Sequence, residues 1–435
     1  MSARPDFHLD VYQNEYLPEG GREVNAVVTV SAEAGSGPAV AAAPTVAAAE
    51  VIIVDCSGSM GFARDKMRAA KQAASVAVDT LRDGVLFAVV AGNHEATMVY
   101  PKGSQLVVAN AQTKAFARGA IGGVQPGGGT AIGQWLTMAN RLFAGHQNTI
   151  KHAILLTDGR NEHEQPADLD RAISQSEGQF VCDCRGVGAE WEVSELRRIA
   201  SALLGSVDIV ADPAGLVADF EAMTATAMGK AVADVALRLW TPQGATVKFV
   251  KQVSPSMADL TDRKVVSGPQ SADYPTGSWG TESRDYHVCV EVNPAGVGDV
   301  MLAGRVSLVL AVPDGPGEVL GQGLVKATWT DDAVLSTRIN PEVAHYTGQA
   351  ELADVIQEGL EARKVGDLDT ATAKLGRAVA LATETGNTDT AKLLSKVVDV
   401  DDPVTGTVRL KSKVAEVDAM TLDTRSTKTS RVRKS

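Results

Sequence analysis

The stretch Val-Ile-Ile-Val-Asp-Cys-Ser-Gly-Ser-Met at residues 51–60 decides the fold. Its first four residues are apolar and β-branched, which is typical of a strand buried on both faces of a parallel sheet. Oxygen-bearing side chains follow at once, on Asp55, Ser57 and Ser59. Strand ends in open α/β sheets border the crevice where ligands bind, and the D-x-S-x-S spacing lets one bend aim all three side chains at a single point. The stretch therefore predicts a central strand that ends in a cation site.

Two later segments carry matching residues. Residues 127–131 read Gly-Gly-Gly-Thr-Ala, and residues 155–159 read Leu-Leu-Thr-Asp-Gly at the end of another apolar run. Together with residues 51–60 they resemble the metal-ion-dependent adhesion site (MIDAS) of the von Willebrand factor A (VWA) family, in particular its bacterial cytoplasmic members. The resemblance covers roughly residues 49–230. It implies five metal ligands: Asp55, Ser57, Ser59, Thr130 and Asp158.

The expected ligands offer only carboxylate and hydroxyl oxygens, which suit a hard divalent cation and disfavour zinc. Mg²⁺ is the expected ion, with Ca²⁺ and Mn²⁺ as alternatives. In the family the two aspartates commonly act through water while the hydroxyls bind the ion directly, which leaves a place for an acidic side chain of a partner protein. An alternative is that Asp55 and the serines only cap the next helix. That alternative does not explain why Thr130 and Asp158 occur with them.

No catalytic residue is predicted. A serine nucleophile at Ser57 or Ser59 needs a histidine base, and His152 and His163 are the only candidates by position. The chain contains no G-x-S-x-G elbow, Walker loop or dinucleotide fingerprint. We therefore expect a non-enzymatic, metal-dependent protein-binding module in a cytoplasmic signalling or assembly complex. The alternative is a non-catalytic subunit of an ATPase- or chelatase-type enzyme assembly.

Length and charge set further limits. A chain of 435 residues is long enough for two to four structural units. Its net charge of −12 argues against a general nucleic-acid or anionic-membrane binder. No segment has the order of a signal peptide or the length of a membrane span, so the expected compartment is the cytoplasm.

The organisation changes along the chain. Strands alternate with helices over residues 49–229, which predicts a doubly wound, mostly parallel α/β sheet. Short strands separated by Pro, Gly and Asp then predict a β-sandwich, and helical periodicity follows it. The expected units are strands completing the sandwich (1–48), the VWA domain (49–229), the β-sandwich (230–340), a small helical bundle (341–400) and a flexible tail (401–435).

The C-terminal tail mixes hydroxyl groups with basic residues and has few apolar groups. A solvated basic terminus is the simpler interpretation. The alternative is a phosphorylation segment, with Thr424 and Thr427 as the first candidates. Some bacterial VWA proteins accompany Ser/Thr kinases and forkhead-associated (FHA) readers of phosphothreonine, so a kinase and an FHA-domain protein are expected partners in that case.

Overall fold

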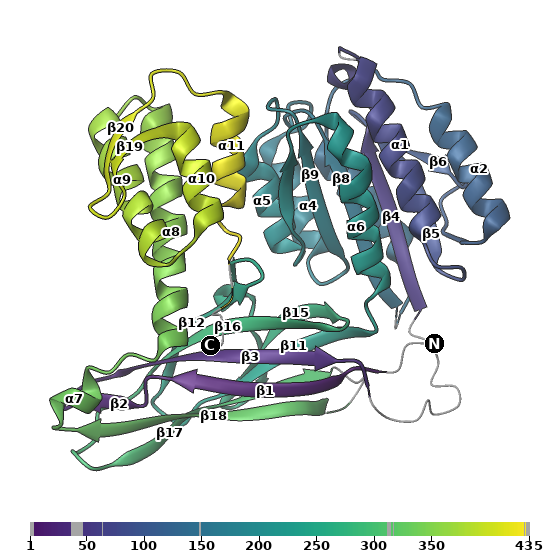
Figure 1. Cartoon of the computed structure of the whole chain (residues 1–435). Coiled ribbons are helices and arrows are strands. Elements are labelled where there is room, and N and C mark those ends of the chain that lie inside the picture. The colour runs from purple at the N-terminus through teal and green to yellow at the C-terminus, as the bar shows by residue number, and fades with distance from the viewer. Residues whose placement is uncertain are drawn as a thin grey trace. The chain divides into compact units, whose positions relative to one another are not determined.

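The computed structural model describes residues 4–35, 47–62, 64–147, 149–310, 315, 317–429 and 431. Within these ranges the chain forms two compact units (Figure 1). One contains residues 47–233. The other combines residues 4–35 with residues from 234 onward. Residues 36–46 lie outside the described residues.

The first unit is built on a seven-stranded sheet, and the predicted α/β class is confirmed. The strand order is β10-β9-β8-β4-β5-β6, and β7 also pairs with β5. All pairs are parallel except those that β6 and β7 make with β5. The strands are β4 (Ala47–Asp55), β5 (Leu86–Gly92), β6 (Ala96–Tyr100), β7 (Val107–Val108), β8 (Thr149–Thr157), β9 (Val181–Val187) and β10 (Val207–Val210).

Helices cover both faces of this sheet. They are α1 (Arg64–Thr80), α2 (Ala111–Gly122), α3 (Ile132–Phe143), α4 (Pro166–Ser176), α5 (Val193–Ala202) and α6 (Leu216–Met228), with short 3₁₀ turns η1 (Gly58–Gly61) and η2 (Pro213–Gly215). Apolar residues of α1, α2 and α6 share one core cluster with the sheet. On the opposite face, Trp135 of α3 packs on Gly92 and Trp191 packs on Gly186.

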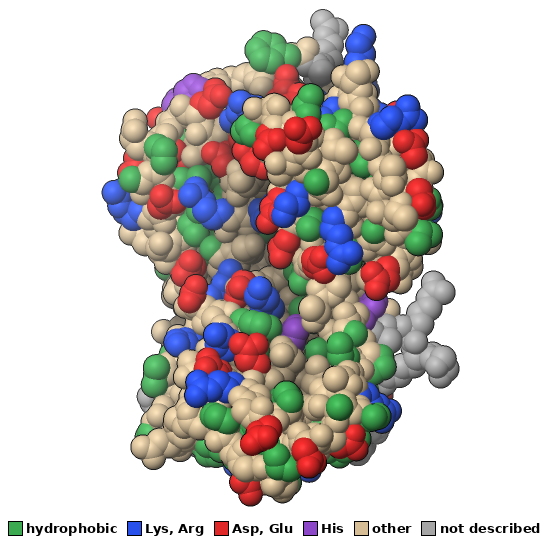
Figure 2. Space-filling model, turned by 90° about the vertical axis from the view of Figure 1, so that its left-hand side faces the viewer, with side chains coloured by type: hydrophobic (Ala, Val, Ile, Leu, Met, Phe, Trp, Pro, Cys, Tyr) green, Lys and Arg blue, Asp and Glu red, His purple; other side chains and the backbone are tan. Residues whose placement is uncertain are grey.

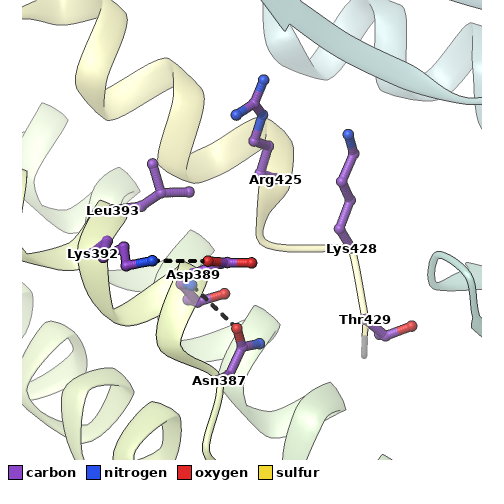
Figure 3. Close-up of a pocket in the computed structure, with 8 residues that line it drawn as sticks. Asn387, Asp389, Lys392, Leu393, Arg425, Lys428 and Thr429 are labelled. Atoms are coloured by element: carbon purple, nitrogen blue, oxygen red, sulfur yellow. Dashed lines mark hydrogen bonds and ion pairs between the residues drawn. The ribbon is translucent and has the colours of Figure 1, made fainter. Parts of the chain in front are cut away.

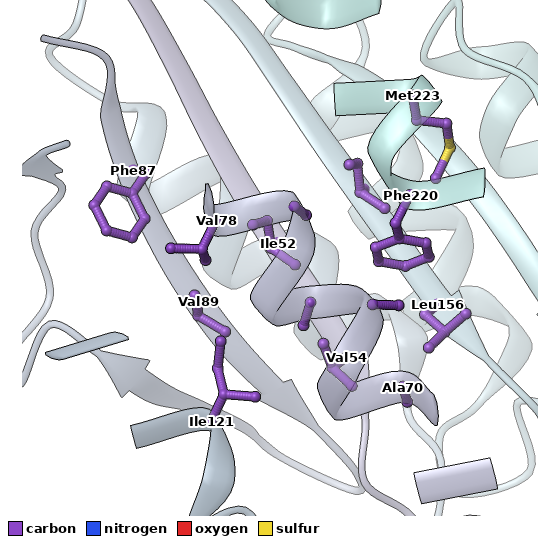
Figure 4. Packing of buried hydrophobic residues seen from close by; sticks show 14 of the residues in the cluster. Ile52, Val54, Ala70, Val78, Phe87, Val89, Ile121, Leu156, Phe220 and Met223 are labelled. Carbon is purple, nitrogen blue, oxygen red and sulfur yellow. The ribbon is translucent and has the colours of Figure 1, made fainter. Parts of the chain in front are cut away.

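The core between β4, α1 and α6 is built mainly from apolar side chains (Figure 4). Ile52 of β4, Val78 of α1 and Phe220 of α6 are fully buried there. Each fully buried side chain of this size stabilises the folded state by about 1.5–3 kcal/mol. Burial of these side chains therefore supplies much of the stability of the sheet.

The second unit contains two mainly antiparallel sheets that form a sandwich-like region. Their orders are β1-β3-β16-β12-β13 and β14-β15-β11-β17-β18-β2. The strands are β1 (Asp6–Gln13), β2 (Tyr16–Pro18), β3 (Glu23–Glu33), β11 (Val232–Trp240), β12 (Thr246–Ser254), β13 (Ala258–Asp259), β14 (Val265–Gly268), β15 (Ser271–Trp279), β16 (Glu282–Glu291), β17 (Val300–Leu310) and β18 (Glu318–Thr330), with the 3₁₀ turn η3 (Thr261–Arg263).

The N-terminal strands belong to these sheets. β1 pairs antiparallel with β3, and β3 continues the ladder onto β16 with Val24 opposite Val290. The short β2 joins the other sheet by pairing parallel with β18. Residues on both sides of the first unit in sequence therefore share both sheets of the second.

A helical layer follows the sandwich in sequence. It comprises α7 (Ala333–Ser336), α8 (Pro341–Lys364), α9 (Leu368–Glu384), α10 (Thr388–Val397) and α11 (Glu416–Arg425), with a hairpin of β19 (Val398–Asp402) and β20 (Thr407–Leu410). One core cluster joins α8, α9 and α10 to this hairpin and α11. None of the described helices is long and apolar enough to cross a membrane.

The expectation of a flexible tail from residue 401 onward is wrong for the described part of that segment. β20 and α11 lie in that range, and Val408 and Leu422 are buried in the helical core. Beyond α11 the chain pairs with the sandwich, where Thr429 N donates to Pro255 O at 3.2 Å. Arg431 then makes two hydrogen bonds to Asp285, at 2.9 and 2.6 Å. Tertiary contacts order this segment although it has little apolar periodicity of its own.

Candidate functional site

The candidate site lies where the strand order of the first unit reverses. β4 ends at Asp55 and β8 ends at Thr157, immediately before Asp158. The two strands are parallel neighbours, while β5, which follows β4 in sequence, pairs on its other side. Such a reversal opens a crevice at the carboxyl ends of the strands. Asp55 and Asp158 are both fully buried at this end of the sheet.

Asp55 is held by the chain on both of its oxygens. Ser57 N donates to Oδ1 at 2.7 Å, and Thr157 Oγ1 donates to Oδ2 at 2.6 Å. Burial is the dominant influence on this carboxyl, and it raises the pKa of Asp55 to about 6 in spite of these bonds. A nearby positive charge would favour the ionised form of such a group.

A chain of hydroxyl groups connects the first segment to the second aspartate. Ser57 Oγ and Ser59 Oγ lie 2.9 Å apart, and Ser59 Oγ donates to Asp158 Oδ1 at 2.6 Å. Thr130 joins them, because a methyl group placed on Gly159 would lie 3.3 Å from Thr130 Oγ1 and 3.4 Å from Ser59 Oγ. All five residues expected as ligands therefore lie around one point.

Backbone contacts fix the glycine-rich loop against the end of β4. Gly58 N donates to Gly128 O at 2.8 Å, and Gly127 N donates to Cys56 O at 2.7 Å. Gly128 has a φ of +81°, and a Cβ there would overlap the ring of His94. Only glycine meets both requirements without strain. The loop thus carries Thr130 to the strand ends.

The segment after Asp158 holds the start of α3. Asn161 Oδ1 accepts from Ile132 N at 2.7 Å, and Glu164 Oε1 accepts from Gly133 N at 2.7 Å. His163 Nδ1 accepts from Thr130 N at 3.1 Å, so its lone pair is already used. These side chains position Thr130 and the helix that follows it. Apart from their place after the aspartate, no sequence pattern indicates that role.

His152 is far from the serines. It lies opposite Glu50 in the β4–β8 ladder, five residues before Asp55, which is about 16 Å along a strand. It bonds Glu50 and Asp183 instead. Neither His152 nor His163 is therefore placed to act as a base toward Ser57 or Ser59.

Lys66 was not singled out from the sequence. It lies in the first turn of α1, and its Nζ is 2.9 Å from Asp158 Oδ2 and 2.7 Å from Glu190 Oε2. Its side chain is 15% exposed, and Glu190 is 64% exposed. An ammonium group therefore already lies beside one expected metal ligand.

The donor set fits a hard divalent cation. Two buried carboxylates and three hydroxyl groups surround the site, and none of its donors is a sulfur or imidazole nitrogen. Among the described residues, no group of three or more His, Cys, Asp or Glu side chains is placed to hold a metal ion. Hydroxyl groups would thus have to complete any coordination at Asp55 and Asp158.

The two threonines considered for phosphorylation lie in ordered chain. Thr424 belongs to α11 and is fully buried, so a kinase could reach it only after that helix unfolds. Thr427 is partly exposed, and its carbonyl oxygen accepts from Met257 N at 2.9 Å. Its modification stays a prediction.

A pocket of about 410 Å³ lies beside these residues (Figure 3). Its lining comes from α10 and from the end of α11 onward: Asn387, Asp389, Thr390, Lys392, Leu393, Arg425, Lys428 and Thr429. Asp389 and Lys392 form an ion pair at 3.3 Å, and their side chains are 92% and 75% exposed. Because this pair is solvated and satisfied, we assign no ligand to the pocket.

Charges of both signs are mixed on the face drawn in Figure 2. Blue and red side chains alternate there, without one extended patch of either sign. That face therefore lacks the single-sign field that would attract a polyanion.

A doubly wound sheet with oxygen-bearing side chains at its switch point is the arrangement expected of a VWA-type domain. A profile of the von Willebrand factor type A domain matches residues 49–209, and one of the von Willebrand factor type A C-terminal domain matches residues 380–426. A solved von Willebrand factor type A structure from Catenulispora acidiphila is 56% identical, with 99% of this chain and 98% of that chain covered and a TM-score of 0.93. The chain therefore belongs to the von Willebrand factor type A family.

Two more distant similarities add less. The ArnB paralog VWA2 from Sulfolobus acidocaldarius is 16% identical over 98% of both chains with a TM-score of 0.58, which shows a shared fold alone. An uncharacterised protein from Synechocystis sp. is 31% identical over 222 residues, covering 48% of this chain. The match covers 49% of that relative, so the chain spans about half of its length.

Proposed function

We propose that this chain is a non-enzymatic protein-binding module whose first unit binds an acidic residue of a partner through a divalent cation, Mg²⁺ in the first instance. VWA domains often mediate protein–protein interactions. The observation that carries the proposal is the convergence of five oxygen-bearing side chains from three separate segments: Asp55, Ser57, Ser59, Thr130 and Asp158.

Each residue has a distinct part in this proposal. The hydroxyl groups of Ser57, Ser59 and Thr130 are the direct donors, and Asp55 and Asp158 supply the negative charge. Because only two of the five donors are charged, a bound Mg²⁺ keeps enough electrophilic character to attract an incoming carboxylate. Thr157 positions Asp55 through its 2.6 Å hydrogen bond.

Conservative variants test the site by calorimetric titration with MgCl₂. Asp55→Asn keeps the shape and the acceptor for Ser57 N but removes the charge, and Thr130→Val keeps the branched shape but removes the hydroxyl. Each is expected to weaken Mg²⁺ binding by about 10- to 100-fold or more, as loss of a metal-site partner usually does. Their unfolding should stay cooperative, because the core is apolar.

Thr137→Val is the matched control. It removes a threonine hydroxyl from α3 that donates to Gly133 O at 2.8 Å and is not one of the five expected ligands, so Mg²⁺ affinity should not change. If Asp55→Asn and Thr130→Val both bind Mg²⁺ as the wild type does, the site assignment is wrong. The wild-type chain should capture a partner protein when Mg²⁺ is present. Capture should be lost in EDTA, and it should also be lost with the Thr130→Val variant.

A further inference from the structure

Lys66 links the candidate metal site to the surface of the first unit. Its Nζ lies within hydrogen-bond distance of two carboxylates, Asp158 at 2.9 Å and Glu190 at 2.7 Å. Asp158 is fully buried, whereas Glu190 is largely exposed. One flexible side chain therefore connects an expected metal ligand to a solvated acid.

Both carboxylate oxygens of Asp158 already accept a hydrogen bond from the chain. Oδ1 accepts from Ser59 Oγ at 2.6 Å, and Oδ2 accepts from Lys66 Nζ. A divalent cation that draws on Asp158 must therefore displace the ammonium group or share the carboxylate with it. Two positive charges at such short range repel each other strongly in a buried site, where screening by water is weak.

Glu190 is a second ion-pair partner for Lys66. It lies in the loop after β9, and this loop is held by Gly188 N donating to Val210 O and by Trp191 Nε1 donating to Gly188 O. A Cβ on Gly188 would lie 3.8 Å from Lys66 Cε, so the side chain runs along this glycine. With four methylene groups, Lys66 can leave Asp158 and keep Glu190.

We propose that Lys66 is a tethered counter-ion that competes with the divalent cation for Asp158 and withdraws toward Glu190 when the cation binds. This inference rests on the proposed metal site. Its consequence is that Lys66 lowers the affinity of the site for Mg²⁺ and stabilises the metal-free state. The site then loads only when the cation, or the cation together with an acidic partner, outcompetes the ammonium group.

Lys66→Met tests the proposal by calorimetric titration with MgCl₂ on the full chain. Methionine keeps an unbranched stem and removes the charge. The expected result is Mg²⁺ affinity higher by about tenfold or more, the size typical for a group acting on a metal ligand. Thermal unfolding gives a second readout: without Mg²⁺ the variant should melt below the wild type, and MgCl₂ should raise its Tm more.

Three variants separate this effect from general changes. Lys66→Arg keeps the charge, so its affinity should stay near that of the wild type. Lys71→Met removes the same charge from α1 at a residue whose Nζ donates to Gly122 O, and Mg²⁺ affinity should not change. Glu190→Gln removes the alternative partner, so Lys66 should stay on Asp158 and Mg²⁺ should bind more weakly.

The outcomes distinguish the two proposals. Equal or weaker Mg²⁺ binding by Lys66→Met, while the wild type binds and Thr130→Val does not, overturns the role of Lys66 and leaves the metal site standing. Absence of binding in both the wild type and Lys66→Met overturns both. Should Lys66→Met fold only with MgCl₂ and unfold in EDTA, that dependence supports the competition, because the cation then replaces the missing ammonium group.

Discussion

His152 lies between two carboxylates inside the first unit. Nδ1 is 2.8 Å from Glu50 Oε1, and Nε2 is 2.9 Å from Asp183 Oδ2. Burial works to lower the pKa of His152, but the charge of Glu50 and the bonds to both acids outweigh it and raise the pKa to about 10. The imidazole is therefore charged at neutral pH and holds β4, β8 and β9 together on one face.

Replacing His152 should be costly. His152→Gln leaves the buried carboxylate of Glu50 without its cation, whereas Asp183 keeps its hydrogen bonds from Ser206. Breaking a buried pair in this way typically costs about 3–5 kcal/mol of unfolding free energy. Urea unfolding at pH 7 measures it. His146→Gln, in the same unit, is the control and should cost little, because His146 is partly exposed and bonds Phe143 O through its backbone N–H, which the substitution keeps. A small loss for His152→Gln would mean that water or relaxation solvates Glu50 and Asp183.

The same group predicts a pH dependence. The folded pKa of His152 lies above the unfolded value near 6.5, so its stabilisation is fully present below about pH 6.5 and is lost as pH rises through about 10. The wild type should lose unfolding free energy across this range relative to His152→Gln, whose stability lacks this contribution. Parallel pH profiles for the two proteins would contradict the assigned charge.

The residues at the strand ends differ in how far sequence could identify them. Asp55 comes directly after the apolar run at residues 51–54 of β4, and Asp158 comes one residue after the apolar run at residues 153–156 of β8, so the sequence itself marks their place. Lys66 and Thr157 carry no such mark, because their partners depend on how a helix turn and a neighbouring strand meet in space. Oxygen-rich strand ends can be predicted from the local sequence pattern, whereas the ammonium group of Lys66 that lies beside Asp158 cannot.

At the level of elements, long periodic segments were predictable and the C-terminal segment was not. The alternation of strands and helices expected over residues 49–229 is found as β4 to β10 and α1 to α6, because these segments carry the apolar residues that the sheet and its helices bury. The hairpin β19–β20 buries few residues of its own, among them Val408 on α9 and α10. Its order comes from contacts with segments that precede it in sequence, which local periodicity does not reveal.

The contact of α9 with the β19–β20 turn gives a test at this scale. Gly376 of α9 faces Gly406, and a Cβ on Gly376 would overlap the carbonyl oxygen of Gly406. Gly376→Ala should therefore destabilise the second unit by about 1–3 kcal/mol, the usual cost of overpacking, although alanine favours helix. Gly119→Ala in α2 meets nothing within 4 Å and should stabilise by about 0.5–1 kcal/mol. Thermal melting compares them, and a stabilised Gly376→Ala would show that the turn can move away.

At the scale of the whole molecule, the chain enters the second unit, leaves it for the first and returns. β3 lies inside its sheet, between β1 and β16, and β2 closes the edge of the other sheet beside β18. Removing residues 4–35 would therefore expose the ladder of β16 from Glu282 to Glu291 as well as the edge of β18. Unpaired edges of this length are sites of aggregation.

We therefore expect two excised segments to behave differently. Residues 47–233 contain a complete sheet and its core, so they should be monomeric and unfold cooperatively on their own. Residues 234–435 alone should aggregate, and should become monomeric when residues 1–35 are joined to them by a flexible Gly/Ser linker of about 15 residues, long enough to span a gap of a few nanometres. Size-exclusion chromatography and thermal unfolding measure both. A 234–435 segment that is monomeric and unfolds cooperatively would contradict the view that the first unit is inserted into the second. In that case β16 and β18 would be stable without the N-terminal strands that pair with them here.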